Sequence, residues 1–352
     1  MSKSKNIVAN ILLLLLSLFT SLISFEVLAR ALFVEHPPLV VASNDFHLIY
    51  ELNPHYPEIN SFGMRQEEFD PSTLRNQFVI AVIGDSHSFS DKSAVWKNSF
   101  PARLEHYLGA LSEKSVKVLN FGVPGYNMVQ ELEVLKVKAL QFKPDLIILQ
   151  YCINDEHISN WIQPKYGWLN RAIHTSVFLT HAWEKVLYSE FGRTYLLSYV
   201  ETYLPDLLLY GPGLVGTPRA RGEQDPAHGG FHPPRSRDQV PVRYWDFIGR
   251  ENLERAVNVF GRIAKEAGIP TLATGFIEDR DRNLYEASGF QVYSFFQIFH
   301  GFNIRDYGYD PALTDDHFSD KGADFIGRSL ASFINANFAS GLTYSAPLTA
   351  GE

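Results

Sequence analysis

Cysteine is nearly absent from this chain, in which Cys152 is the only one among 352 residues. A single cysteine excludes an intramolecular disulfide framework and any Cys-rich metal site. An excess of basic residues is also missing, because the formal net charge is −8. A general basic surface for nucleic acid is therefore excluded. We expect no nucleic-acid partner, no metal and no other cofactor.

Charge is missing entirely from the N-terminal stretch 7–25, whose centre is a run of leucines. With the apolar residues that follow, it reaches the roughly twenty residues that a helix needs to cross a bilayer. Lys3 and Lys5 precede it, so the positive-inside rule keeps the N-terminus in the cytoplasm and exports the rest. We expect residues 1–33 to form a single-pass membrane anchor, with the following domain in the periplasm or outside the cell.

A cleaved signal peptide is the competing interpretation, because Ala29-Arg30-Ala31 loosely fits a small-x-small cleavage site. The apolar run is long for a signal peptide, however, and Glu26 and Arg30 add charges near its end. We therefore favour the uncleaved anchor. Residues 34–76 are rich in Pro, Asn and His without a steady period. They predict an exported linker and N-terminal extension that settles on the domain.

Apolar runs of strand length alternate with helical patterns over the rest of the chain. The runs lie at 78–83, 116–119, 146–149 and 271–277, and a further helix and short strand are expected within 282–305. Continuous apolar runs are typical of parallel strands covered on both faces. The alternation predicts an α/β fold, a three-layer α/β/α sandwich with a parallel sheet.

We place this domain at 77–340, with a frayed tail at 341–352. Between about 160 and 245 the regular pattern loosens, and much of that stretch is Gly, Pro, Arg and His in no clear order. Long irregular segments in compact domains are usually functional or disordered. We expect an insertion that forms a lid or a binding flap.

Two helix starts carry capping signals. Ser99 can cap a helix whose first turn contains Pro101. Asn127 with Gln130 resembles a capping box for the next helix, which Lys143-Pro144 should end.

Polar motifs stand where the predicted strands end. Gly84-Asp85-Ser86 ends the first, Gly122–Gly125 follows the second and Asn154 follows the third, while His317 precedes the last predicted helix. The carboxyl ends of parallel strands are where open α/β sheets hold their ligands. Ser86 is therefore placed to be a nucleophile, and the alternative is an ordinary strand-to-helix turn with a serine cap.

These four blocks arrive in order over residues 78–330 and resemble those of the SGNH, or GDSL-type, hydrolase family, which is named for Ser, Gly, Asn and His. The resemblance implies a flavodoxin-like fold with Ser86 as nucleophile and His317 as base. It also implies an oxyanion hole made by the Ser86 amide, the Gly125 amide and the Asn154 side chain. Such a serine needs a base to take its proton, a carboxylate to orient that base, and donors for the anionic intermediate.

The sequence departs from the family pattern in two places. The family often has an aspartate three residues before the histidine, where this chain has Thr314. Asp315 is the best substitute, and Asp316 is the weaker candidate because neighbouring side chains point apart in an extended segment. Ser90 stands where a glycine often follows the nucleophile block, which changes the shape of the pocket floor but removes no catalytic group.

We assign no catalytic role to three further features. We expect His87 to be a wall of the pocket and Asp85 to hydrogen-bond the turn backbone. The segment Ser61–Arg65 resembles one found in membrane-anchored members of the family, and the sequence assigns it no chemistry.

The predicted function is a membrane-anchored serine esterase that cleaves an acyl ester, by expectation an acetyl ester, from an envelope polysaccharide or lipid. An O-acetyltransferase with the same triad is the first alternative. It would need a membrane partner, because a single helix cannot bring an acyl donor across the bilayer. A non-catalytic polysaccharide-binding module is the second, and the intact Ser86, Asn154 and His317 argue against it.

Overall fold

The computed structural model describes residues 2–32, 39–158, 160–161, 215–216, 242–310 and 317–342. The chain divides into two compact units, one of Met1–Pro38 with Gln163–Gly213 and one of Leu39–Ile162 with Leu214–Glu352. Most of the insertion and of the tail predicted above lies outside the described residues. The domain boundaries expected from the sequence, and the lid, stay predictions.

The first unit begins with helix α1, Ser2–Leu32. Within it, Ala9–Arg30 is a 22-residue segment that is long and apolar enough to cross a membrane. Its large apolar side chains are exposed. A helix also satisfies its backbone hydrogen bonds internally, as a bilayer requires. A signal sequence near an N-terminus meets the same criterion of length and composition.

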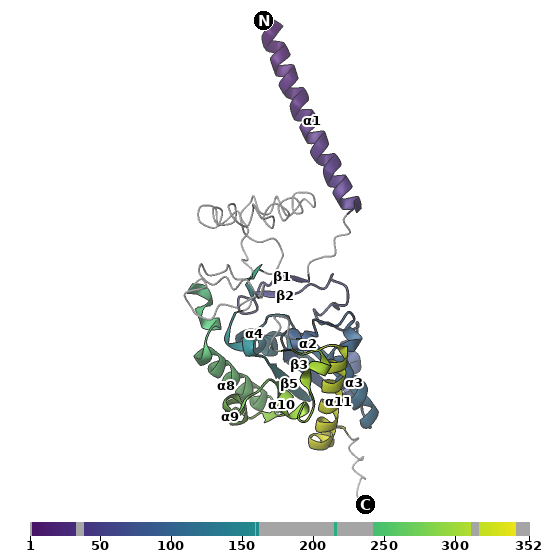
Figure 1. The fold of residues 1–352 in the computed structure, drawn as a ribbon, viewed down its shortest axis with the longest axis vertical. Helices are drawn as coiled ribbons and strands as arrows, with labels where there is room; N and C mark the ends of the chain where they lie inside the picture. Colours follow the sequence, from purple (N-terminus) through teal and green to yellow (C-terminus); the bar gives the residue numbers. More distant parts are fainter. Residues whose placement is uncertain are drawn as a thin grey trace, which may run out of the picture. The chain divides into compact units, whose positions relative to one another are not determined.

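A five-stranded parallel sheet with the order β4-β3-β5-β8-β9 is the centre of the second unit (Figure 1). Its strands are β3 (Gln77–Gly84), β4 (Ser115–Gly122), β5 (Leu146–Tyr151), β8 (Thr271–Gly275) and β9 (Gln291–Val292). Gly84 pairs with Gly122, and Tyr151 pairs with Gly275, so four strands end at one edge. The predicted parallel sheet is confirmed, and its order is the flavodoxin-like one.

Helices cover both faces of this sheet. Phe78, Ile80 and Val82 share a buried cluster with α3 and α11, so the intervening residues of β3 face the opposite layer. There α4 packs against α8 (Figure 1). Burying one such aliphatic side chain stabilises the fold by about 1.5–3 kcal/mol. The main helices are α2 (Ser86–Phe89), α3 (Phe100–Leu111), α4 (Met128–Val134), α8 (Arg250–Glu266), α9 (Asp279–Ala287), α10 (Phe295–Ile298), α11 (Asp320–Asn337) and α12 (Ala339–Leu342).

Short elements complete the unit. A π-helical turn η3 (Leu135–Ala139) and a 3₁₀ turn η4 (Leu140–Phe142) continue α4. The other 3₁₀ helices are η1 (Pro71–Asn76), η2 (Trp96–Asn98), η5 (Ile153–Glu156), η8 (Val242–Phe247) and η9 (Ile304–Tyr307), and the strand pairs are β1 (Val40–Ala42) with β2 (Tyr50–Leu52) and β6 (Asn160–Trp161) with β7 (Val215–Gly216).

The extension before the sheet packs on the loop that follows β4. Tyr50 and Leu52 are almost fully buried. The Tyr50 hydroxyl donates to the Pro124 carbonyl at 2.8 Å, and its ring centroid lies 5.1 Å from that of Tyr126. The extension is therefore part of the wall that supports the block containing Gly125.

Local signals placed these two helix starts correctly, whereas strand ends were predicted less well. The Ser99 side chain accepts from the Ala102 amide, and Asn127 with Gln130 forms the predicted capping box. The strand predicted at 271–277 ends at Gly275 instead. Gly275 has φ +117°, and a Cβ there would lie 2.0 Å from the Tyr151 carbonyl oxygen, so the chain turns away from the sheet at that residue.

Candidate active site

The strand order places the first and third polar motifs beside each other. The chain runs from β3 outward to β4 and then returns to β5 on the other side of β3. Ligands of open α/β sheets bind at such a reversal, outside the carboxyl ends of the strands. Ser86 follows β3 and Asn154 follows β5 at this edge.

Ser86 is the first residue of the one-turn helix α2, and close packing fixes this helix on the strand ends. The Asp85 carboxylate caps it by accepting from the His87 amide at 2.9 Å. A Cβ on Gly84 would lie 2.4 Å from Ser88 Oγ, and one on Gly122 would lie 2.5 Å from the Phe89 nitrogen. Only glycine at these two positions allows α2 to approach β3 and β4 this closely.

Two side chains from the strands below hold α2 at Ser88. Gln150 Oε1 accepts from the Ser88 amide at 3.1 Å and from Ser88 Oγ at 3.0 Å. Asn120 Nδ2 donates to the Ser88 carbonyl at 3.0 Å. Gln150 and Asn120 are both buried. Sequence reasoning missed these two residues, although a polar residue near the end of an otherwise apolar strand is the signal that could have found them.

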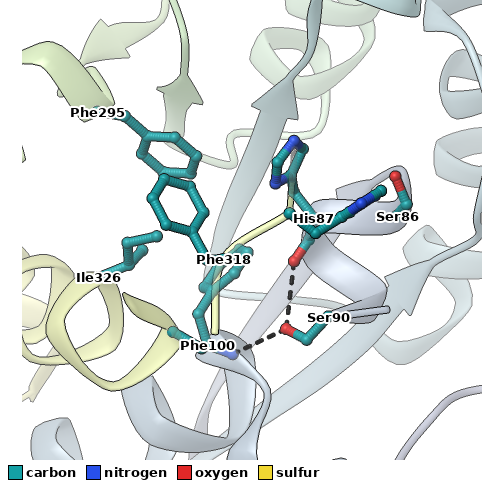
Figure 2. A pocket seen from close by; sticks show the side chains of 9 residues that line it. Ser86, His87, Ser90, Phe100, Phe295, Phe318 and Ile326 are labelled. Atoms are coloured by element: carbon teal, nitrogen blue, oxygen red, sulfur yellow. Dashed lines mark hydrogen bonds between the residues drawn. The ribbon is translucent and has the colours of Figure 1, made fainter. Parts of the chain in front are cut away.

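The structure brings Ser86 and His317 to the wall of one pocket (Figure 2). Their neighbours on this wall include Phe100, Phe295 and Phe318. The His87 ring centroid lies 5.0 Å from that of His317 and 5.7 Å from that of Phe318. In Figure 2, His87 stands between Ser86 and the Phe295 and Phe318 rings. His87 therefore forms part of the wall, as expected.

Gly125 and Asn154 also lie close together. The Tyr126 amide donates to the Val123 carbonyl at 3.1 Å, and Gly125 between them has φ +77°. Proline at position 124 and a positive φ at 125 match the pattern of a type II turn, which requires glycine there. Asn154 Nδ2 donates to the Tyr126 carbonyl at 3.3 Å, so the amide of Asn154 borders this turn.

The two candidate acids of the triad, Asp315 and Asp316, lie outside the described residues, as does Thr314. Asp85 bonds the turn backbone, in agreement with the sequence interpretation. Its other oxygen accepts a long 3.5 Å hydrogen bond from Ser86 Oγ. The orientation of His317 by one of these carboxylates stays a prediction.

Two buried carboxyl groups lie beneath the site, and sequence reasoning did not anticipate them. Glu131 on α4 is fully buried, and neither of its oxygens has a hydrogen-bond partner among the described residues. Burial, with the charge of Asp85, raises the pKa of Glu131 well above its usual range. Burial, with the charges of Glu131 and Asp85, also raises the pKa of Asp155. Each acid, when charged, disfavours the ionisation of the other.

A wider, open cleft lies beyond β8, formed by the segments that follow β8 and β9. Phe296 on its wall is 52% exposed. The Phe296 ring centroid lies 5.8 Å from that of Phe276, which in turn lies 5.8 Å from that of His87. A chain of ring contacts therefore joins the cleft to the wall of the serine pocket.

Among the described residues, Asp45, His47 and Glu133 could offer one ligand atom each to a metal, all within 4.8 Å of one another. Lys136 Nζ already pairs with Glu133 at 2.8 Å. The Lys136 ammonium already balances the charge of Glu133, and we assign no metal to these three residues.

No protein-family model and no curated protein matches the chain. Solved structures do match it. One is a proposed lipolytic protein of the G-D-S-L family from Desulfitobacterium hafniense DCB-2, with 12% identity and TM-score 0.36 over 73% of this chain and 99% of that chain. Another is the acetyl xylan esterase AlAXEase, with 10% identity and TM-score 0.38 over 73% and 99%.

A third match is a catalytic mutant of an acetylxylan esterase from Geobacillus stearothermophilus, with 12% identity and TM-score 0.38 over 72% of this chain and 92% of that chain. The G-D-S-L family named for the first of these structures is the family that the four sequence blocks resemble.

Proposed function

We propose that this protein is a membrane-anchored serine esterase of the SGNH type that faces the periplasm or the cell exterior. It cleaves an acyl ester, in our proposal an acetyl ester, carried by an envelope polysaccharide or lipid. One observation carries the proposal: Ser86 and His317 line one pocket at the carboxyl edge of the sheet, the edge at which the Gly125 turn and Asn154 also follow their strands.

In the proposed reaction His317 takes the proton of Ser86 Oγ as the oxygen attacks the ester carbonyl carbon. The tetrahedral intermediate collapses when His317 returns this proton to the leaving alcohol, and the acyl group stays on Ser86. Water then attacks the acyl-enzyme by the same route and releases the carboxylic acid. Asp315, or Asp316 as the weaker candidate, would orient His317 and stabilise its cationic form.

The oxyanion of the intermediate needs donors that are held in place before the reaction. We assign this role to the amides of Ser86 and Gly125 and to Asn154 Nδ2. The capped helix and the glycine turn support the assignment because both restrain the backbone that carries these donors. Removing one such donor typically costs about 2.7–4 kcal/mol of barrier.

The size of the pocket supports a short acyl group. Its apolar wall includes Phe100, Phe295, Phe318 and Ile326, and the space between them is about 10 Å³, about the room of one water molecule. A methyl group needs little more, whereas a long acyl chain would have to displace buried aromatic rings. The open cleft beside Phe296 could take the alcohol part of a larger ester.

The test combines labelling with two kinetic assays on the full-length protein in detergent. A serine-directed phosphonate should label Ser86, and Ser86→Ala should abolish both labelling and hydrolysis of p-nitrophenyl acetate. His317→Ala should lose most of the activity as well, and the double variant should lose no more, because the two residues act as one unit. Glu266→Gln, an exposed position at the end of α8, is a control that should label like the parent.

The same assay separates the alternatives. A labelled protein that turns over p-nitrophenyl acetate only when a sugar acceptor is added, releasing p-nitrophenol and moving the acetyl group to the sugar instead of releasing acetate, is a transferase. A correctly folded protein that neither labels nor hydrolyses short esters would reject the catalytic function and leave the polysaccharide-binding module.

A further inference from the structure

The segment Ser61–Arg65, to which the sequence assigned no chemistry, follows Asn60 and ends with a contact to helix α2. Asn60 Oδ1 accepts from the Phe62 and Met64 amides at 3.1 and 3.0 Å, which closes the segment into a compact turn. Gly63 has φ +72°, and the Met64 side chain is fully buried. This anchored turn directs the Arg65 side chain into the domain.

Arg65 reaches the end of α2 opposite Ser86. Its Nη1 donates to the carbonyls of Phe89 and Ser90 at 2.7 Å each, and its Nη2 donates to the Ser93 carbonyl at 2.5 Å. The guanidinium carbon also lies 4.5 Å from the centroid of the Phe89 ring. One side chain thus gathers three carbonyls of the segment that follows the proposed nucleophile.

These contacts satisfy backbone carbonyls that so short a helix leaves without intrahelical partners. The last four carbonyls of any helix lack intrahelical partners, and α2 has only four residues. A guanidinium offers five donors in a rigid planar fork, and its bonds to carbonyls are charge-assisted. The Arg65 side chain is only 6% exposed, and Glu58 Oε2 lies 3.4 Å from its Nη2, so the cation is both shielded from water and partly neutralised.

We infer that Arg65 is a positioning residue for the proposed esterase reaction: it fixes the carboxyl end of α2 and thereby the place of Ser86. The inference rests on the proposed function for its catalytic part. The Asp91 amide donates to the Ser86 carbonyl at 3.2 Å, so the segment that Arg65 holds is bonded directly to Ser86. A release of this segment would move the Ser86 hydroxyl and its amide together.

Lysine cannot replace the fork, because its ammonium is a single point of charge on a flexible stem. We therefore expect Arg65→Lys to lower kcat for p-nitrophenyl acetate by about 10–100-fold, the size of loss that a misplacement of about 1 Å can cause. KM should change by less than about twofold, since Arg65 touches no substrate. Rates are expressed per phosphonate-labelled site, so a partly unfolded preparation does not mimic the effect.

Lys117→Met is the matched control. Lys117 is also a buried cation, paired with Glu67 at 3.6 Å and Glu105 at 3.3 Å near the start of β4. Its loss should lower the melting temperature like that of Arg65 but should leave kcat per labelled site within about twofold. Hydrogen exchange of a peptide covering residues 84–93 should become faster in Arg65→Lys and stay unchanged in Lys117→Met.

Exchange and kcat at parent levels in Arg65→Lys would overturn the positioning role. If the parent itself proved inactive, the esterase function would fall, and the exchange measurement would still decide whether Arg65 holds α2.

Discussion

Ser90 ends α2 with a left-handed backbone, φ 63° and ψ 63°. This conformation costs an ordinary residue about 1–2 kcal/mol and costs glycine little, which gives a physical reason for the glycine often found there in the family that the chain resembles. Ser90 offsets part of this strain through its hydroxyl. Oγ donates to the His87 carbonyl at 3.2 Å and accepts from the Phe100 amide at 3.3 Å (Figure 2).

Glycine at position 90 should therefore lower the free energy of unfolding less than alanine does. Ser90→Ala keeps the strain and loses both hydrogen bonds, so we expect a loss of about 1–3 kcal/mol in the free energy of unfolding. Ser90→Gly also loses the bonds but relieves the strain, and should stay within about 1 kcal/mol of the parent. Urea unfolding of the three proteins measures the order. If alanine were the better tolerated residue, the left-handed strain would not be a real cost at this position.

Single residues of the site differed in how well sequence could predict them. Ser86, Gly125, Asn154 and His317 stand in recognisable blocks at the ends of predicted elements. The use of Arg65 could not be predicted, because its carbonyl partners lie 24–28 residues away in the chain and backbone acceptors leave no mark in the sequence. Buried polar partners of this kind are visible only in the fold.

At the scale of elements, Glu131 and Asp155 join the two segments that frame the proposed oxyanion hole. Glu131 lies on α4, which follows the Gly125 turn, and Asp155 lies on η5 next to Asn154. The pKa of each carboxyl is raised in the folded protein, by burial first and then by neighbouring charges. The folded state therefore holds protons that the unfolded chain releases near its ordinary pKa of about 4.5.

Stability should consequently fall as pH rises above that value, because the unfolded state binds fewer protons there. The loss is at most about 1.4 kcal/mol for each pH unit and each such proton. We expect Glu131→Gln to remove much of this slope, so that its melting temperature gains on the parent from pH 5 to pH 8. The control is Glu133→Gln, two residues further along α4, where the glutamate is paired with Lys136. Its melting temperature should show no such gain.

A Glu131→Gln variant whose difference from the parent stayed constant over this pH range would show that Glu131 ionises normally in the fold.

Strands and helices were easier to predict than their ends. The apolar runs predicted β3, β4, β5 and β8 because buried parallel strands need continuous apolar residues. β4 nevertheless extends to Gly122, through Asn120, whose buried polar side chain interrupts the apolar pattern. The helix expected to run to Phe142 continues as π and 3₁₀ turns instead, a change of hydrogen bonding that apolar spacing alone does not distinguish.

At the scale of the whole molecule, the proposed location of the protein depends on α1. If Ala9–Arg30 spans the membrane, the full-length protein should remain with membranes after carbonate and high-salt washing, since a spanning helix inserts almost irreversibly. A chain that begins at Leu39 should be released by the same wash. Recovery of a soluble mature form that starts near Leu32 would identify a cleaved signal sequence.

The first border along the chain between the two units falls after Pro38, well before the first strand of the central sheet. Tyr50 and Arg65, which buttress the Gly125 turn and the Ser86 helix, stand on the catalytic side of that border. In evolution or in the laboratory, a new targeting sequence joined upstream of Leu39 would thus leave these two supports of the proposed active site in place. A junction placed just before β3 would preserve all four blocks that contain Ser86, Gly125, Asn154 and His317 and would still discard the residues that support them.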